Sequence, residues 1–366
     1  MKKLRLALLG CPLLVACATT PPSDPYAGAD STSDDSGAAD SAVSRLVTGF
    51  SKIDLVSDRD GAVTKDLNLV NPWGIAFNPA GPAWIANNHS GTSTVYDAAG
   101  ALKLTVTLPA ATGSTDPSSP TGQVFNAVTA DFSGDKFIFD GEDGRVYGWK
   151  PGTGATVRAD HSAAHAVYKG LAIANDDYGA QHLYLTDFRN GKVVVLDASY
   201  HQVTLDGAFA DPQIPAGYAP FNVQALEGKI LVTFAKQGAG GADDDHGPGR
   251  GYVDQFDTEG QFERRLITRG AMNSPWGLAI APSSWGALAG MLLVGNFGNG
   301  RVHAYDIHAA GSHGREKVVA KGTLAIGSSA LVIDGLWALA VGPDHQLYFT
   351  AGPNGEANGL FGRLAH

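Results

Sequence analysis

A glycine returns six times along this chain, each time a few residues after an apolar, strand-like run has ended and just before another begins. Five of these glycines stand six positions before the last residue of the strand-like segment that follows. Self-similarity of this kind is typical of repeat architectures, in which each unit buries its apolar face against its neighbours. The chain is therefore expected to form an array or a closed ring of similar units. The six positions are Gly91, Gly144, Gly191, Gly251, Gly300 and Gly359.

Each unit begins with a short apolar strand that follows a turn. A second strand follows a polar turn, a third begins after the repeated glycine, and a fourth is visible at 102–107. Four strands per unit and six units describe an all-β fold, the six-bladed β-propeller. The equivalent positions of the first strands, spaced roughly 50 residues apart, are Gly74, Gly122, Gly170, Asn222, Gly277 and Ala338.

The last unit predicts how the ring closes. It ends with its third strand, at 359–364, and lacks a fourth. Residues 50–56 are the one strand-like segment before the first unit, so we expect this N-terminal strand to become the missing outer strand and to leave no open edge. Seven blades with one unit overlooked, or an open array, are the alternatives.

The first residues predict export. Three basic residues, at positions 2, 3 and 5, precede an apolar run at 6–16 that is shorter than the roughly 20 residues of a membrane-spanning helix. The run ends in Leu-Val-Ala before Cys17, which resembles the bacterial lipobox. This resemblance implies a lipoprotein signal peptide at 1–16, a lipid on Cys17 and, because Ala18 follows, attachment to the outer membrane. A plain secretory signal with a chance cysteine is the alternative.

Composition bounds the rest of the chain. Residues 17–44 contain five aspartates and no basic residue, so we expect the lipidated cysteine and a disordered acidic tether before a domain at 45–366. Both cysteines, Cys11 and Cys17, precede that domain, which leaves it no thiol for disulfides, zinc or nucleophilic catalysis. The formal net charge of −10 argues against nucleic acid as a partner.

Two loop segments carry a family resemblance. Residues 185–193 and 294–302 each read as the end of a strand, Asp or Asn, then Asn-Gly, a basic residue and Val. This pattern resembles the NHL repeat, and the architecture resembles the NHL-repeat and gluconolactonase-type six-bladed propellers. Nearly the whole domain is similar to a family of bacterial extracytoplasmic propellers, which implies a fold and an envelope location but no reaction. The matching segments are 68–74, 218–222, 296–298 and 348–354.

One column of equivalent residues ends the second strands, and four of its six members are Asp or Asn. Carboxylate and amide oxygens are the ligands of hard cations, and gluconolactonase-type enzymes hold a divalent metal at a comparable place. No glutamate stands at the entry of a first strand, where those enzymes supply a ligand. Asp and Asn also open tight turns by bonding to their own backbone, and this structural role is the alternative. The candidate ligands of a divalent cation such as calcium are Asn87, Asp140, Asp187 and Asn296; Ala235 and Ala351 complete the column.

A second column precedes the glycine position of the first strands. It is mostly aromatic, and it would form either a packing layer or a floor for a ligand with apolar or ring faces. Its charged member, Lys169, would anchor a ligand, act in chemistry through a lowered pKa, or extend to solvent. The candidate ligand-binding residues are Trp73, Lys169, Phe221, Trp276 and Trp337, and Thr121 completes the column.

The fourth unit contains an insertion between Lys236 and Arg250, with many glycines, three aspartates and a histidine. It would close over the channel mouth, bind a cation, or remain a solvated loop. His89 and Lys169 are the candidate catalytic residues, although no serine or histidine constellation accompanies them.

These patterns predict a lipid-anchored, monomeric envelope propeller that binds an unidentified small molecule or envelope protein at its loop-rich mouth. A metal-dependent hydrolase or lactonase that uses the Asp and Asn column is the alternative hypothesis. A ring that serves only as a scaffold is the third.

Overall fold

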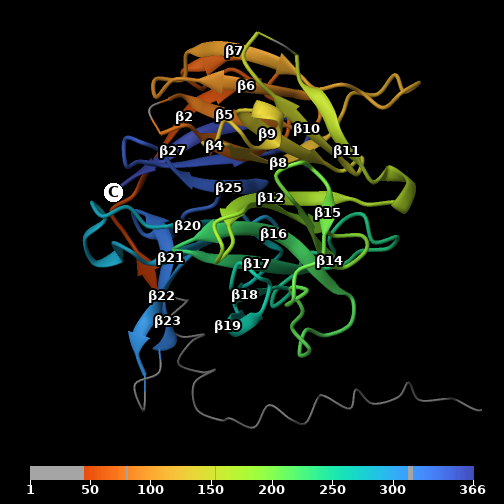
Figure 1. The fold of residues 1–366 in the computed structure, drawn as a ribbon. Helices are drawn as coiled ribbons and strands as arrows, with labels where there is room; N and C mark the ends of the chain where they lie inside the picture. Colours follow the sequence, from red (N-terminus) through yellow and green to blue (C-terminus); the bar gives the residue numbers. More distant parts are fainter. Residues whose placement is uncertain (1–44, 80, 153, 312–315) are drawn as a thin grey trace, which may run out of the picture.

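The computed structural model describes residues 45–366 apart from residues 80, 153 and 312–315. Six sheets, antiparallel apart from one strand pair in each of two sheets, follow one another around a ring, as the sequence predicts (Figure 1). The predicted signal peptide, Cys17 and the acidic tether lie outside the described residues. Among the described residues, no helix has the length and apolar character needed to span a membrane.

The first three blades are sheets of four consecutive strands. Blade one contains β4 (Pro72–Phe77), β5 (Ala83–Asn87), β6 (Thr92–Tyr96) and β7 (Leu102–Thr107). Blade two contains β8 (Pro120–Phe125), β9 (Phe137–Gly141), β10 (Arg145–Trp149) and β11 (Thr156–Asp160). Blade three contains β12 (Tyr168–Asn175), β13 (Gln181–Asp187), β14 (Lys192–Leu196) and β15 (Gln202–Val203).

The last three blades repeat this order, and blades five and six also contain the N-terminal strands. Blade four contains β16 (Tyr218–Leu226), β17 (Lys229–Lys236), β18 (Tyr252–Phe256) and β19 (Phe262–Thr268). Blade five contains β20 (Pro275–Ile280), β21 (Leu292–Asn296), β22 (Val302–Ala310) and β23 (Glu316–Ile326), with β1 (Leu46–Val47) and β24 (Ser329–Ala330) beside β23. Blade six contains β25 (Leu336–Val341), β26 (Leu347–Ala351), β27 (Leu360–Ala365), β2 (Ser51–Ser57) and β3 (Thr64–Lys65).

Burial follows the position of a strand in its blade. The first strand of blade one, β4, is buried along almost its whole length, whereas the outer strand β7 is mostly exposed. The innermost strands contact one another in the cyclic order β4, β8, β12, β16, β20, β25 and back to β4. A strand that is covered on both faces needs continuous apolar residues rather than alternation, which explains the short apolar runs that open each unit.

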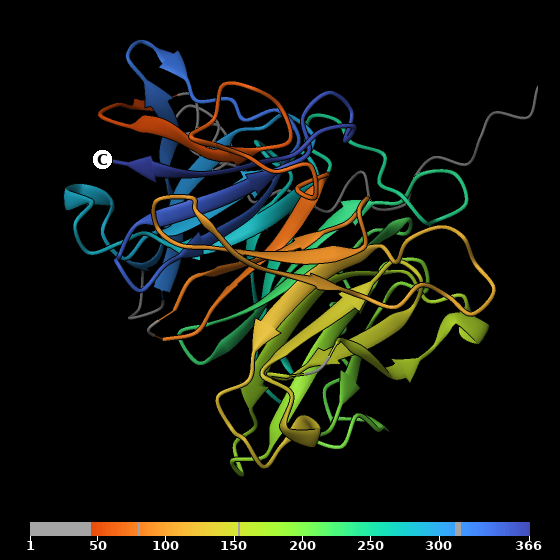
Figure 2. The ribbon, with the colours of Figure 1, turned by 90° about the horizontal axis from the view of Figure 1, so that it is seen from above.

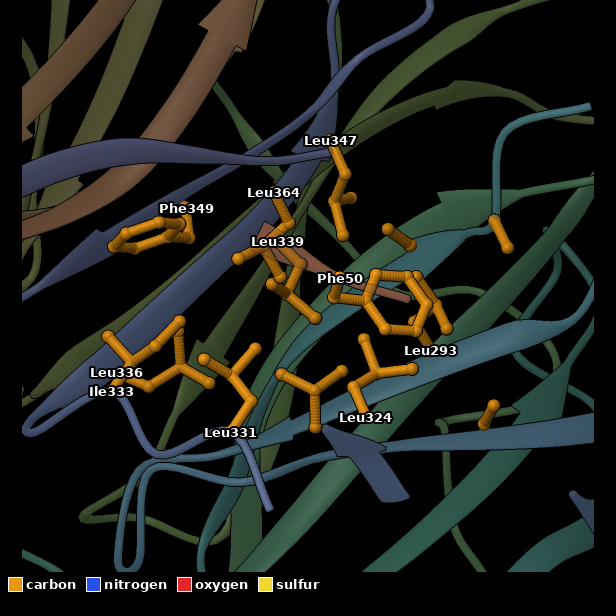
Figure 3. Close-up of a cluster of buried hydrophobic side chains, with 14 of the residues drawn as sticks. Phe50, Leu293, Leu324, Leu331, Ile333, Leu336, Leu339, Leu347, Phe349 and Leu364 are labelled. Atoms are coloured by element: carbon orange, nitrogen blue, oxygen red, sulfur yellow. The ribbon is translucent and has the colours of Figure 1, made fainter. Parts of the chain in front are cut away.

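The ring is closed as the sequence predicts. Strand β2 pairs antiparallel with β27, from Ser51 opposite Ala365 to Ser57 opposite Leu360, so the N-terminal strand becomes the outer strand of the last blade. Blades six and one lie side by side in both views (Figures 1 and 2). Phe50, just before β2, packs among leucines of blades five and six, including Leu324 and Leu339 (Figure 3).

Candidate functional site

The aromatic column meets in the centre of the ring. The rings of Trp73 and Trp337 stack with centroids 3.5 Å apart, and the ring of Trp276 stands edge-on to both, at 6.1 and 5.8 Å. Phe221 lies 6.1 Å from Trp337, and the Lys169 ammonium lies 5.1 Å above the Trp73 ring. These five predicted ligand-binding residues come from five different blades, so their side chains fill the axis rather than line an open channel.

Burial defines what this cluster does in the fold. None of the five residues is more than 2% exposed, and Thr121, the sixth member of the column, is also buried. The packing-layer alternative therefore describes how these side chains are arranged, because no ring face is open to solvent. Their role in ligand binding stays a prediction, and a ligand at the mouth would rest above the tryptophans.

Two further aromatic rings belong to this cluster of buried side chains on the axis of the propeller, which we call the aromatic plug. Phe297 stacks on Trp337 with centroids 4.0 Å apart, and Phe188 lies 5.2 Å from Phe221. Each follows directly after a member of the Asp and Asn column, Asn296 or Asp187. Neither ring was among the residues predicted from the sequence, although this shared position was visible in the two NHL-like segments.

Hydrogen bonds fix two of the three indoles. The Trp276 Nε1 donates to the Lys169 carbonyl oxygen at 2.9 Å, and the Trp337 Nε1 donates to Asn71 Oδ1 at 2.9 Å. The Trp73 Nε1 is buried and has no hydrogen-bond partner among the described residues. Trp73 is thus held by stacking and by the cation above it.

Lys169 is the charged centre of the site. Its Nζ lies 2.5 Å from Glu142 Oε1 and 3.3 Å from Asp243 Oδ1. Burial alone would lower the pKa of Lys169, but Glu142 and Asp243 outweigh this effect, and the net shift of the pKa is upward. The expectations that Lys169 extends to solvent or has a lowered pKa are therefore wrong. A raised pKa favours the charged ammonium, which bonds to carboxylates.

Carboxylates surround this ammonium at the loop-rich end of the ring. Glu142 comes from the β9–β10 loop, Asp243 and Asp244 from the blade-four insertion, and Glu356 from the β26–β27 loop. We call these four residues and Lys169 the acidic mouth. Burial raises the pKa of Glu356 to about 7, and the neighbouring Glu142, Asp243 and Asp244 act in the same direction, while Lys169 opposes them. Four carboxylates thus face one ammonium.

Hydrogen bonds hold this rim in place. Asn88 Nδ2 donates to Glu142 Oε2 at 2.9 Å, and the Ser274 hydroxyl donates to the Asp244 carboxylate. Burial raises the pKa of Asp244, and the bond from Ser274 and the nearby His246 oppose that shift. Glu142 and Glu356 were not predicted from the sequence. Glu142 stands two residues after Asp140, as His89 stands two residues after Asn87, so the repeat itself carried a signal for it.

His89 lies at the edge of this site. Its ring is exposed, and its Nε2 lies 3.3 Å from Asn71 Nδ2. Among the described residues, no hydrogen bond or ion pair joins it to Lys169 or to a carboxylate. The two candidate catalytic residues are therefore not in contact, and a catalytic role for either stays a prediction.

The Asp and Asn column is engaged in its own loops and blades. Asn87 donates to Thr92 and Thr94, Asp140 accepts from Thr121 and Gly122, Asp187 accepts from Val167 and Asn190, and Asn296 accepts from Asn273 and donates to Ala271. These bonds agree with the structural alternative. Within the described ranges, no group of three or more His, Cys, Asp or Glu side chains is placed to hold a metal. Calcium binding by this column stays a prediction.

The blade-four insertion is tied down at several points. Asp245 pairs with Lys236 at 3.0 Å and with Arg250, and the Gly247 N–H donates to Asn273 Oδ1 at 2.7 Å. Asp244 forms an isolated bridge with Gln237. The insertion therefore rests on blade five as well as on its own blade.

Comparison with known proteins places the chain in a family but indicates no reaction. No protein-family model matches the chain. Two uncharacterised proteins of Acanthamoeba polyphaga mimivirus are similar to it: one is 32% identical over 343 residues, 87% of this chain and 81% of the relative, and the other 31% identical over 335 residues, 85% and 84%. The chain belongs to their family. These relatives are viral, so membership of a bacterial extracytoplasmic family stays a prediction.

Solved structures share the fold. A putative oxidoreductase (glucose dehydrogenase) of Thermus thermophilus aligns with a TM-score of 0.54 and 17% identity over 87% of this chain and 100% of its own. The soluble aldose sugar dehydrogenase of Escherichia coli aligns with 0.52 and 13% over 87% and 99%. A streptogramin B lyase aligns with 0.50 and 11% over 87% and 97%. At these identities the likeness concerns the propeller alone.

Proposed function

We propose that this propeller is a binding protein that takes a cationic ligand at its acidic mouth. The observation that supports it is the imbalance of charge around Lys169, where Glu142, Asp243, Asp244 and Glu356 face a single ammonium. Clefts lined by one sign of charge attract ligands of the opposite sign. Organic ammonium groups fit best, because the carboxylates give anchoring bonds to a positively charged donor.

We also propose that the protein works in the cell envelope as a lipoprotein. The support is the basic, apolar and lipobox-like sequence before Cys17. Membrane fractionation of cells that express the full chain tests this part, with Cys17→Ser as the variant. The wild type is expected in the outer-membrane fraction and the variant in the soluble fraction; equal distribution of both would reject the anchor.

Calorimetric titration with spermidine tests the ligand class, with maltose and citrate as neutral and anionic probes. We expect one spermidine site, no heat from the other two probes, and weakening of binding by salt. Glu142→Gln should lower the affinity by about tenfold, since bonds to charged groups contribute roughly 1.5 kcal/mol or more. Asp116→Asn, which removes an exposed carboxylate elsewhere, is the matched control. Absence of spermidine binding, or equal loss in the control, would reject the proposal.

The alternative, a metal-dependent hydrolase or lactonase, would draw on two buried oxygens that have no hydrogen-bond partner among the described residues, Asn87 Oδ1 and Asp140 Oδ2, but those residues include no group of three His, Cys, Asp or Glu side chains placed to hold a metal. Its four candidate ligands are already bonded within their own blades, as described above. Hydrolysis of a lactone by the purified protein that requires calcium and stops with a chelator would favour this alternative over a binding protein.

A further inference from the structure

The blade-four insertion and the Arg250 that follows it, residues 237–250 together, reach from their own blade toward several others. Asp243 contacts Lys169 of blade three, and Asp244 accepts from Ser274 at the entry of blade five. The His246 ring stands edge-on to Phe297, 6.3 Å away, so the insertion also lies beside the aromatic plug. These contacts place the segment over the mouth.

One ion pair joins the tip of the insertion to the buried centre. The Lys169 side chain is 3% exposed, whereas that of Asp243 is 85% exposed, so Asp243 closes over the ammonium from the solvent side. Lys169 also pairs with Glu142, in the β9–β10 loop of blade two. The same ammonium therefore serves both the body of the propeller and the insertion.

Like charges oppose this closed position. Asp243 and Asp244 on the insertion face Glu142 and Glu356 on the body, and each of the three other carboxylates raises the pKa of Glu356. Repulsion between these carboxylates disfavours the closed position unless a positive charge lies between or beside them. Lys169 pairs with Glu142 and Asp243, and among the described residues neither Asp244 nor Glu356 forms an ion pair with a lysine or an arginine.

We propose that residues 237–250 are a lid over the acidic mouth, held by the Lys169–Asp243 ion pair and completed by the charge of a bound cationic ligand. This proposal rests on the proposed function for the identity of the ligand, but the latch is a property of the protein alone. A cation bound beside Asp243 and Glu356 supplies a further counter-charge, so ligand binding stabilises the closed position. The ligand is thereby enclosed by the segment that recognises it.

Hydrogen exchange of the full chain, followed by mass spectrometry over peptides of residues 237–250, tests the lid. Asp243→Asn and Glu356→Gln each remove one negative charge from the same site, but they should act in opposite directions. The first cuts the latch and should speed exchange of the lid by about fivefold, the effect of one partly exposed ion pair. The second removes repulsion and should slow it. Asp116→Asn, with the same change of charge, should leave it unchanged.

The ligand part is measured in the same experiment with spermidine as the probe. Spermidine should slow exchange of the wild-type lid and have a smaller effect on Glu356→Gln, where one of the two anchoring carboxylates is missing. If spermidine does not bind, the proposed function fails while the two variants still test the latch. Exchange that changes in the same direction in both variants, or in neither, overturns the lid.

Discussion

The Lys169 ammonium lies 5.1 Å from the centroid of the Trp73 ring, which joins blade three to blade one across the centre of the propeller. Cations over indole faces are attracted by the ring quadrupole, most strongly where water is excluded. Because Lys169 also holds Glu142 and Asp243, one side chain connects the aromatic plug below with the charged rim above. The mouth and the plug are therefore one unit.

Removal of the central indole of the aromatic plug should lower the stability of the protein. Trp337→Ala deletes a buried indole that stacks on both Trp73 and Phe297. We expect the free energy of unfolding to fall by about 3 to 5 kcal/mol, the range for large aromatic residues in cores. Denaturant unfolding measures this. Tyr178→Ala, at a side chain that is 92% exposed, should change stability by less than about 0.5 kcal/mol, and a similar loss in both would contradict the plug.

The sequence predicts the ring because each blade repeats the same order of strands and turns. The missing fourth strand of the last unit and the unpaired strand-like segment at 50–56 together predict closure, and β2 fulfils it within one residue at each end. The strands and turns are local features, and closure follows from the number of strands in each unit. A single sequence therefore suffices to predict them.

The site could be predicted only in part. The repeat places Trp73, Trp276 and Trp337 at equivalent positions, but it does not say that these side chains converge on the axis. That convergence depends on the radius of the propeller and on the rotamers of the tryptophans, which are set by all six blades together. Glu356 was missed because its loop has no counterpart of the same length in the other blades. The ion pairs of Lys169 join residues 27 and 74 positions apart, a distance at which no sequence pattern indicates contact.

A close approach of backbones in the closing pair predicts a second effect. A Cβ at Gly362 would lie 2.6 Å from the Ile53 carbonyl oxygen and 2.5 Å from Phe349 Cζ. Gly362→Ala should therefore separate β27 from β2 and lower stability by about 1 to 3 kcal/mol, as overpacking does. Gly154→Ala, where a Cβ meets nothing within 4 Å, is the control. Equal thermal unfolding of the two variants would show that closure tolerates the methyl group.

The buried Asp140 predicts a pH dependence of stability. Burial raises the pKa of Asp140 to about 7, even though Thr121 and Gly122 donate to it. A carboxyl whose pKa is higher in the folded state binds its proton more tightly there. Its contribution to stability is present below the unfolded pKa of about 4 and is lost as pH rises toward 7.

The test of this dependence is Asp140→Asn, which keeps the oxygen that accepts both bonds but cannot ionise. Between pH 4 and 7 the stability of the wild type relative to this variant should fall with pH, by at most about 1.4 kcal/mol per unit. Denaturant unfolding at several pH values measures the difference. Parallel curves for the two proteins would mean that Asp140 titrates as it does in the unfolded chain.

Asn296 distinguishes the structural role of the Asp and Asn column from the metal hypothesis. Its Oδ1 accepts from the Asn273 N–H at 3.2 Å, and its Nδ2 donates to the Ala271 carbonyl oxygen at 2.8 Å. Asn296→Ala leaves both backbone groups without these partners, which should lower stability by about 1 to 3 kcal/mol. Because this cost involves no cation, thermal unfolding should show the same loss in calcium and in a chelator. A wild-type protein that calcium stabilises, beside a variant that calcium does not affect, would instead assign Asn296 to a metal site and reverse this interpretation.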